Sequence, residues 1–283
     1  MTESSTQPQI IDGATAAWLA GIRGYILDMD GVLYRGNTLI PEVKAFLGAL
    51  DSAGIPYTMA TNNSTNSQLD YVMKLERLGV SVPEESIFTS AVATATYLRS
   101  TYPDGTRVYV VGMKALRHAI FEDGYFFPAE ADADVVVSGA DFELVYGSLR
   151  TACLAIRAGA DYVATNADTT FPSEAGLIPG SGAIVAALVA ATDVEPTIVG
   201  KPSPVMVESC LTAMGIKASQ AVMLGDRLDT DILAGQRANA RTVMVLTGVH
   251  TPADVRRTGI EPDLVIDTLE PLTRFHTHQA SSE

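Results

Sequence analysis

Two aspartates stand directly after an apolar segment near the start of the 283-residue chain, in the run Gly24-Tyr25-Ile26-Leu27-Asp28-Met29-Asp30-Gly31. Such a segment predicts a buried strand, and carboxylates at its carboxyl end lie where open parallel sheets bind ligands. One carboxylate can attack phosphorus and form an aspartyl-phosphate, while a Mg2+ ion offsets the repulsion between the two anions. The second carboxylate, two residues on, is within reach of the leaving oxygen. The run therefore predicts a site for phosphoryl transfer.

A second acidic cluster, Gly225-Asp226-Arg227-Leu228-Asp229-Thr230-Asp231, follows the apolar segment Ala221–Leu224. Mg2+ takes oxygen ligands and is usually held by one or two carboxylates together with substrate phosphate. We expect Asp226 to be such a ligand, facing Asp28. Asp231 is expected not to bind the metal directly but to hydrogen-bond to Lys201 or to a metal-bound water and hold it in place.

A third pair of acids, Asp132 and Asp134, precedes the apolar run Val135–Val137. It would therefore lie at the amino end of a strand, the wrong end for a ligand site, and we interpret it as a solvated turn.

Two polar segments also follow predicted strands. Thr61-Asn62-Asn63-Ser64 offers a hydroxyl and successive backbone N–H groups that can bind an anion, although helix capping explains the same residues. Gly200-Lys201-Pro202 holds a lysine between two residues that restrict the chain, which suits a phosphate clamp, with a solvated lysine as the alternative. No Gly-x-x-x-x-Gly-Lys-Ser/Thr loop is present, so the segment is not a P-loop.

Short apolar segments alternate with helical patterns through most of the chain, which predicts an α/β fold with a parallel sheet. Strands are expected near Tyr25–Asp28, Tyr57–Ala60, Val108–Val111, Val135–Val137, Tyr162–Thr165, Ile198–Val199, Ala221–Leu224 and Thr242–Leu246. Helices are expected at Glu42–Ala53, Asn66–Leu78, Ala91–Ser100, Met113–Glu122, Leu144–Ala158, Ala183–Ala191, Pro204–Met214 and Asp229–Ala238.

The residues singled out above lie in the first ~65 positions and again from Lys201 to Asp231, which suggests an inserted domain. We expect a catalytic core made of residues 1–90 and 189–283, with residues 91–188 inserted between its two parts. The polar ends, residues 1–10 and 277–283, are expected to lack order.

The formal net charge of −14 argues against nucleic acid or an anionic membrane as partner, since both reward clustered Lys and Arg. No apolar run approaches the ~20 residues of a membrane helix, and the first residues lack signal-peptide features, so a cytoplasmic location is expected. His118 and His250 have no ligand-like spacing, and His276 and His278 fall in the polar end of the chain. A histidine base or zinc site is therefore not expected, and carboxylates carry the acid–base chemistry.

These motifs occur in the order and spacing of the four motifs of the haloacid dehalogenase-like hydrolase superfamily, which the chain resembles over nearly its whole length. The Leu33-Tyr34 pair after the first motif, Thr61-Asn62-Asn63 and the insertion after the second motif resemble the NagD-type, C2-capped phosphatases. The resemblance implies a Rossmann-like parallel-sheet core with an inserted α/β cap domain.

The resemblance also implies roles for individual residues. Asp28 would be the nucleophile and Asp30 the general acid, then the base for hydrolysis of the aspartyl-phosphate. Mg2+ would be held by the Asp28 carboxylate, the Asp30 backbone carbonyl and Asp226. Thr61, Asn62, Asn63 and Lys201 would bind substrate.

In the cap, Ala164-Thr165-Asn166-Ala167-Asp168 resembles a Thr-Asn-Pro-Asp segment in which Ala167 replaces Pro. Asn166 and Asp168 are the cap residues expected to face substrate, although a hydrogen-bonded turn explains them equally well. Two polar side chains suit an uncharged leaving group that bears hydroxyls, which favours glycerol phosphate, a sugar phosphate or a similar metabolite. The expected partner is a small phosphorylated metabolite, and the phosphoglycolate and nucleotide classes stay open.

Other functions fit parts of the pattern. A receiver domain uses an aspartyl-phosphate but has no inserted domain, and a phosphonatase of the same superfamily would need a cap lysine, for which Lys114 is the candidate. A phosphotransferase of that superfamily and a sugar-phosphate-binding regulator without activity also remain open. The sequence does not decide the oligomeric state, and a homodimer formed through the cap is one of the open alternatives.

Overall fold

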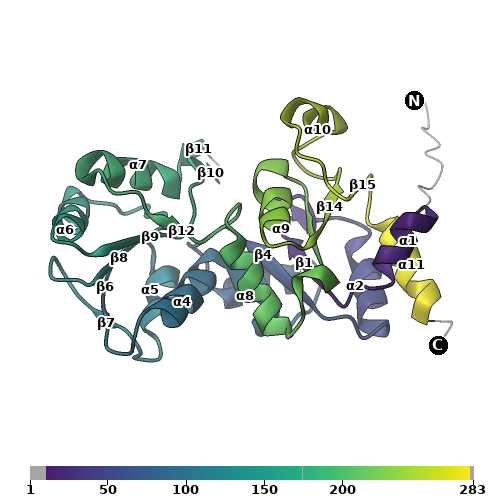
Figure 1. Cartoon of the computed structure of the whole chain (residues 1–283), viewed down its shortest axis with the longest axis horizontal. Coiled ribbons are helices and arrows are strands. Elements are labelled where there is room, and N and C mark those ends of the chain that lie inside the picture. The colour runs from purple at the N-terminus through teal and green to yellow at the C-terminus, as the bar shows by residue number, and fades with distance from the viewer. Residues whose placement is uncertain (1–10, 174, 281–283) are drawn as a thin grey trace. The chain divides into compact units, whose positions relative to one another are not determined.

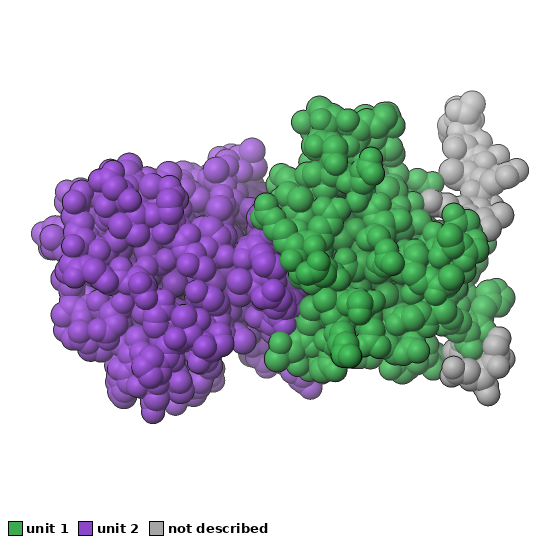
Figure 2. Space-filling model, viewed as in Figure 1, with its two compact units in different colours: residues 1–59, 78–80, 210–283 green, residues 60–77, 81–209 purple. Residues whose placement is uncertain are grey.

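The computed structural model describes residues 11–173 and 175–280. It is an α/β fold with parallel sheets, as the alternation of strand and helix patterns predicted. Contacts divide the chain into two compact units (Figure 2). Unit 1 contains Met1–Met59, Leu78–Val80 and Cys210–Glu283, and unit 2 contains Ala60–Arg77 and Ser81–Ser209. The chain thus leaves unit 1 and returns to it, while the narrower insertion expected at residues 91–188 stays a prediction.

Unit 1 is built on a parallel sheet whose strands run in the order β15-β14-β13-β1-β4. Their bounds are β1 (Gly24–Asp28), β4 (Tyr57–Thr61), β13 (Ala221–Gly225), β14 (Arg241–Val245) and β15 (Leu264–Ile266). The sixth strand of this sheet, β5 (Ile87–Thr89), consists of unit 2 residues, and β4 is the strand along which the chain crosses between the units. Because β1 and β13 are parallel neighbours, their carboxyl ends share one edge.

Helices cover both faces of the unit 1 sheet (Figure 1). The Tyr25 ring meets Phe46 of α2 (Val43–Ser52) and His276 of α11 (Glu270–Ala280) edge-on. Gly235 of α9 (Leu233–Arg237) packs against Met223 of β13. A Cβ placed on Gly235 would lie 2.8 Å from the Met223 Cβ. Tyr25 pairs in register with Val222, so these two side chains point to the same face of the sheet. Met223, the next residue, points to the other face. Helix α9, which packs on Met223, therefore lies on the face opposite α2 and α11.

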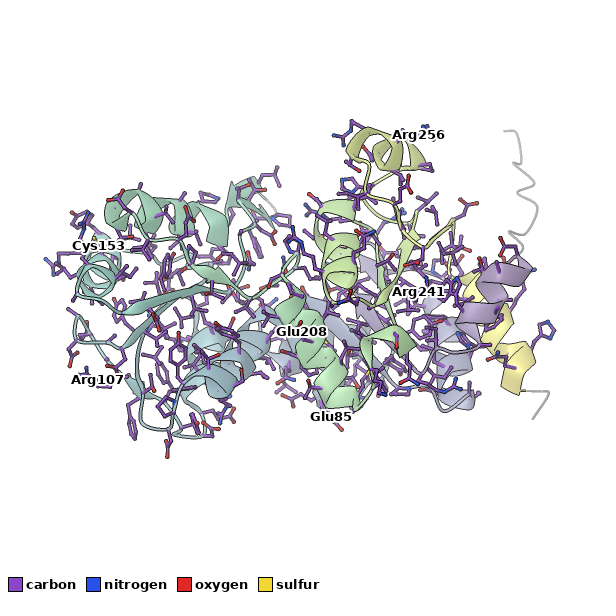
Figure 3. All side chains as sticks on the ribbon, viewed as in Figure 1. Glu85, Arg107, Cys153, Glu208, Arg241 and Arg256 are labelled. Carbon is purple, nitrogen blue, oxygen red and sulfur yellow. The ribbon has the colours of Figure 1, made fainter. Side chains whose placement is uncertain are left out.

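The remaining elements of unit 1 frame this sheet. They are the helices α1 (Gly13–Leu19) and α10 (Pro252–Thr258), the short helix η2 (Ala218–Gln220), the wide turn η3 (Leu228–Ile232), and the hairpin of β2 (Tyr34–Arg35) and β3 (Thr38–Leu39). Arg241 begins β14, pairs with Asp263 at 2.7 Å and lies over the Trp18 ring of α1 (Figure 3). Helix α8 (Pro204–Met214) leads back from unit 2.

Unit 2 has a second parallel sheet, in the order β12-β9-β8-β6-β7. Its strands are β6 (Arg107–Val111), β7 (Phe127–Pro128), β8 (Val135–Ser138), β9 (Asp161–Ala164) and β12 (Thr197–Ile198). Helices α6 (Tyr146–Arg157) and α7 (Ser181–Thr192) pack on one face, and α4 (Ser90–Thr101) and α5 (Lys114–Phe121) on the other (Figure 1). The unit also contains α3 (Gln68–Arg77), η1 (Glu84–Ser86) and the hairpin of β10 (Thr170–Ser173) and β11 (Gly176–Pro179).

The eight strands expected from the sequence are all present, within two residues of their predicted ends. The helix predicted at Asp229–Ala238 is present, and its first turn is the wider π-helical turn η3 that leads into α9. One expectation is wrong: residues 277–280, expected to lack order, complete α11. Residues 1–10 and 281–283 lie outside the described part of the chain.

Across the described residues 11–173 and 175–280, every helix is too short or too polar to cross a membrane.

Candidate active site

Three aspartates converge at the carboxyl edge of the unit 1 sheet. Asp28 ends β1 and Asp226 follows β13, and the adjacent pair Leu27 and Leu224 fixes the register of these parallel neighbours. Asp231 comes from the turn that follows. One carboxylate oxygen of each lies within 4.8 Å of the other two, with Asp226 and Asp231 buried and Asp28 half-buried. The structure therefore brings together the two acidic segments that the sequence singled out.

The wide turn η3 explains how Asp231 reaches this cluster. The N–H groups of Asp231 and Ile232 both donate to the Arg227 carbonyl, so the chain makes a five-residue turn before α9. The Arg227 N–H in turn donates to Asp231 Oδ2 at 3.1 Å. This exchange folds the Asp231 carboxylate back over the start of its own turn, toward Asp226.

Glycines leave the space that these carboxylates occupy. A Cβ at Gly225 would overlap the Asp231 side chain, and one at Gly248 would overlap the Asp226 carboxyl group. A Cβ at Gly31 would lie 2.6 Å from Asp226 Oδ2, and Gly31 also has a φ of +86°, which favours glycine. The carboxylates of the acid cluster therefore fit only because positions 31, 225 and 248 carry no side chain.

Asp30 lies beside this cluster and is exposed. It forms an isolated bridge with Tyr34, and the Gly31 N–H donates to the Tyr34 carbonyl at 2.8 Å. The tight loop after β1 thus presents Asp30 to solvent two residues beyond Asp28, which suits proton transfer. Its role as general acid stays a prediction.

In unit 2, the loop after β4 is tied to the segment after β9. Asn62 donates through Nδ2 to the Lys201 carbonyl at 2.8 Å and to Asp168 Oδ2 at 3.2 Å. The Asn62 carbonyl accepts from Asn166 Nδ2 at 2.7 Å and from the Ser90 hydroxyl at 2.5 Å. Four segments of unit 2 therefore meet around Asn62.

Thr61 and Asn63 shape the same loop. Thr61 Oγ1 accepts from the Asn63 N–H at 3.2 Å, and Asn63 Oδ1 accepts from the Thr65 N–H at 2.7 Å. Both side chains are half-buried. The Asn63 and Thr65 N–H groups thus bond within the loop, and anion binding by this loop stays a prediction.

Lys201 is held in unit 2 by the short strand β12, which pairs with β9. Its side chain is only 2% exposed, and Nζ donates to the Ala60 carbonyl at 3.0 Å. A solvated lysine, the alternative left open by the sequence, is therefore wrong. A buried ammonium group next to the Thr61 loop is a strong point charge for a phosphate.

Asn166 and Asp168, the two residues expected to face substrate from a cap, have different surroundings. Asn166 is 4% exposed, and its Oδ1 accepts from the Asp168 N–H at 3.1 Å while its Nδ2 binds the Asn62 carbonyl, so it holds the turn together. Asp168 is half-buried and touches Asn62. Contact of either residue with substrate stays a prediction.

The structure shows contributors that the sequence did not reveal. Thr247, Val249 and His250, in the loop after β14, hydrogen-bond to the segments that carry the acids. One available signal was their place directly after a predicted strand. The spacing of His250 bears only on metal ligation and does not indicate its hydrogen bond to the backbone.

The pair Asp132 and Asp134 has an unrelated setting. Arg107 binds Asp132 Oδ2 at 2.6 Å and Asp134 Oδ1 at 3.2 Å, at the outer end of β6 (Figure 3). Hydrogen bonds from Arg107 lower the pKa of the Asp134 carboxyl. These acids therefore belong to an exposed ion-pair cluster in unit 2.

Two family models match the sequence. A haloacid dehalogenase-like hydrolase model covers residues 25–126, and a HAD-hydrolase-like model covers residues 198–272. The 5'-nucleotidase YutF of Bacillus subtilis is 37% identical over 247 residues, which are 87% of this chain and 96% of that protein. The chain belongs to the haloacid dehalogenase-like hydrolases. The resemblance drawn from its motifs is confirmed.

Two more haloacid dehalogenase-like relatives refine this placement. An acid sugar phosphatase of Staphylococcus aureus is 37% identical over 240 residues, covering 85% of this chain and 92% of that protein. The structure of NagD from Escherichia coli K-12 has a TM-score of 0.82 at 32% identity, over 88% of this chain and 97% of that one. Asn166 and Asp168 lie outside both matched family ranges, whereas the acids and Lys201 lie inside them.

Proposed function

We propose that this chain is a Mg2+-dependent phosphatase that hydrolyses small phosphomonoesters through an aspartyl-phosphate on Asp28. The family makes it a hydrolase, and the named activities of its relatives are those of a nucleotidase and a sugar phosphatase. The observation that carries the proposal is the convergence of Asp28, Asp226 and Asp231 within 4.8 Å at the carboxyl edge of the sheet.

The residues of the acid cluster fit Mg2+. Carboxylate oxygens are the hard donors that this ion takes, and ligands around one Mg2+ are at most about 4.2 Å apart, twice the Mg–O distance. That limit is close to the observed grouping within 4.8 Å. Gly31, Gly225 and Gly248 keep side chains out of the space around the carboxylates. The ion would be held by Asp28, Asp226 and the Asp30 carbonyl. Asp231 would not bind the ion directly but would contact the groups that do.

Bound Mg2+ would supply positive charge that lets one anion approach another. Asp28 then attacks phosphorus through a carboxylate oxygen, and the bond from phosphorus to the leaving oxygen breaks. Asp30 gives its proton to that oxygen, which departs as an alcohol. In the second step, which hydrolyses the aspartyl-phosphate, Asp30 takes a proton from water and the water oxygen attacks phosphorus. The bond from phosphorus to the Asp28 oxygen then breaks, which frees the Asp28 carboxylate and inorganic phosphate.

The unit 2 residues would bind the phosphoryl group. Lys201 supplies a buried positive charge, and the loop Thr61–Asn63 supplies a hydroxyl and backbone N–H groups. The network around Asn62 holds these donors in fixed positions before substrate arrives, which is the arrangement that electrostatic catalysis requires.

Asp168 points to the class of substrate. Its carboxylate next to Asn62 disfavours a leaving group that carries a second negative charge and favours one that donates hydroxyl protons. Phosphoglycolate therefore fits less well than the other expected metabolites, which are sugar phosphates, glycerol phosphate and nucleoside monophosphates.

A phosphate-release screen tests this function. Purified protein is incubated with a panel of phosphomonoesters and Mg2+, with and without EDTA. We expect turnover of polyol and sugar phosphates well above phosphoglycolate, and loss of turnover in EDTA that added Mg2+ restores. Activity unaffected by EDTA would remove the metal from the mechanism, and a single turnover without release would indicate a binding protein.

A further inference from the structure

The loop Thr247–His250, between β14 and α10, contacts both segments that carry the unit 1 acids. Thr247 Oγ1 donates to the Gly31 carbonyl at 2.6 Å, in the loop directly after Asp30. On the other side, the Val249 N–H donates to Asp226 Oδ2 at 2.6 Å and the His250 N–H donates to the Asp226 carbonyl at 3.2 Å. One four-residue loop therefore joins the two acidic segments.

The His250 side chain adds a contact of a specific kind. The Leu228 N–H donates to His250 Nδ1 at 2.8 Å, which requires an unprotonated Nδ1 and leaves the ring proton of the neutral imidazole on Nε2. Leu228 is the first residue of η3, the turn that carries Asp231. The imidazole therefore holds the point where the chain passes from Asp226 into that turn.

The loop is itself held from behind. Thr251 caps α10 with a capping box, in which its N–H donates to Asp254 Oδ2 at 2.9 Å and its side chain accepts from the Asp254 N–H. The two bonds tie the residue after His250 to the first turn of the helix. His250 is therefore anchored on its other side by the start of α10.

We infer that Thr247 and His250 are positioning residues of the acid cluster, which set the separation of Asp28, Asp226 and Asp231 that Mg2+ binding requires. This inference rests on the proposed function, because it concerns the metal site of that function. Neither residue touches the reacting atoms. Groups that orient metal ligands in this way are worth about 10- to 100-fold in metal affinity or activity.

Variants of His250 and Thr247 separate this role from a purely structural one. His250→Ala removes the acceptor for the Leu228 N–H, whereas His250→Asn keeps an acceptor near the Nδ1 position. Thr247→Val removes the hydroxyl at constant shape, and Thr247→Ser keeps it. Arg256→Ala is the matched control, because Arg256 is exposed on α10, the helix that follows the loop.

Mg2+ affinity is measured on each folded variant by isothermal titration calorimetry, and turnover is followed as Mg2+ is raised. We expect His250→Ala and Thr247→Val to raise the Kd for Mg2+ about 10- to 100-fold, with kcat recovering at saturating Mg2+. His250→Asn, Thr247→Ser and Arg256→Ala should stay within about 3-fold of the original protein.

Folded His250→Ala and Thr247→Val with an unchanged Kd for Mg2+ would overturn the inference, as would a kcat that stays low at saturating Mg2+. If His250→Ala does not fold, Thr247→Val alone decides the question by the same criteria. A different result tests the proposed function: an original protein that binds no Mg2+ contradicts the metal site itself.

Discussion

The two units hold their polar residues in different ways. In unit 1, strand ends, a wide turn and glycines place three carboxylates, so backbone does most of the positioning. In unit 2, the side chains of Asn62, Asn166 and Lys201 make the hydrogen bonds that hold their own loops. The difference indicates that the acids can be changed without loss of the fold, whereas changing the polar residues of unit 2 also removes hydrogen bonds that hold their loops.

The largest expected effect is that of Asp28→Asn. The substitution removes the attacking oxygen but keeps size and position, so kcat should fall at least about 10,000-fold, in line with the loss of other catalytic nucleophiles. The melting temperature should not fall, because one negative charge leaves a cluster of three. Phosphate release and thermal denaturation check both parts.

Asp132→Asn is the matched control, since Asp132 belongs to the exposed Arg107 cluster. It should leave kcat unchanged. A well-folded Asp28→Asn variant with most of its activity would contradict the assignment of the nucleophile, and one that fails to fold would contradict the contrast between the units.

The next effect concerns how unit 1 is stabilised away from its acidic edge. His276 is fully buried, its Nε2 lies 2.7 Å from the Tyr25 hydroxyl, and burial lowers its pKa from 6.5 to about 4. The unfolded chain therefore binds more protons between these two values. Stability should be fully present above pH 6.5 and fall by up to about 3 kcal/mol as the pH drops through 4.

Urea unfolding between pH 4 and 7 measures this loss. His276→Gln, which cannot gain the charge, should flatten the pH dependence, whereas His278→Gln on the exposed side of the same helix should leave it in place. An unchanged pH dependence in His276→Gln would assign the acid sensitivity to the carboxylates instead.

The smallest effects compare Asn166 and Asp168. Asn166→Ala removes a buried amide and leaves the Asn62 carbonyl with one donor fewer, so the free energy of unfolding should fall by about 1–3 kcal/mol. Asp168→Ala should change it by less than about 0.5 kcal/mol, as is usual for residues that are not buried. Its expected effect is a higher KM for sugar phosphates, with p-nitrophenyl phosphate spared.

Denaturant unfolding and steady-state kinetics on both substrates distinguish the two residues. Equal losses of stability would show that the whole turn acts as one structural unit. Equal losses on both substrates would remove Asp168 from substrate selection.

Much of this architecture could be predicted from the sequence because its signals are local. Apolar strands that run into Asp28, Thr61 and Asp226 mark one edge of a parallel sheet, and the strand alternation gives the fold class. Strand β12 was also visible, but its pairing with β9 was not, because two residues carry no information about their neighbour.

His276 shows why other features were hidden. It continues the spacing of Leu269 and Leu272 along the buried face of α11, but a histidine among polar residues gives no apolar periodicity. The wide turn η3 and the bond from Leu228 to His250 depend on backbone geometry set by contacts distant in sequence. Patterns of residue type do not contain that information.

The division of the chain has a consequence for biosynthesis. Strand β1 has an early neighbour in β4, but its neighbour on the other side, β13, begins only at Ala221, after the whole of unit 2 has been made. Domains generally fold as units during synthesis, so unit 2 can fold while one edge of β1 still lacks its partner strand. That edge of the strand that ends in Asp28 therefore stays unpaired in the nascent chain until Ala221 is made, and chaperone binding or aggregation is expected there.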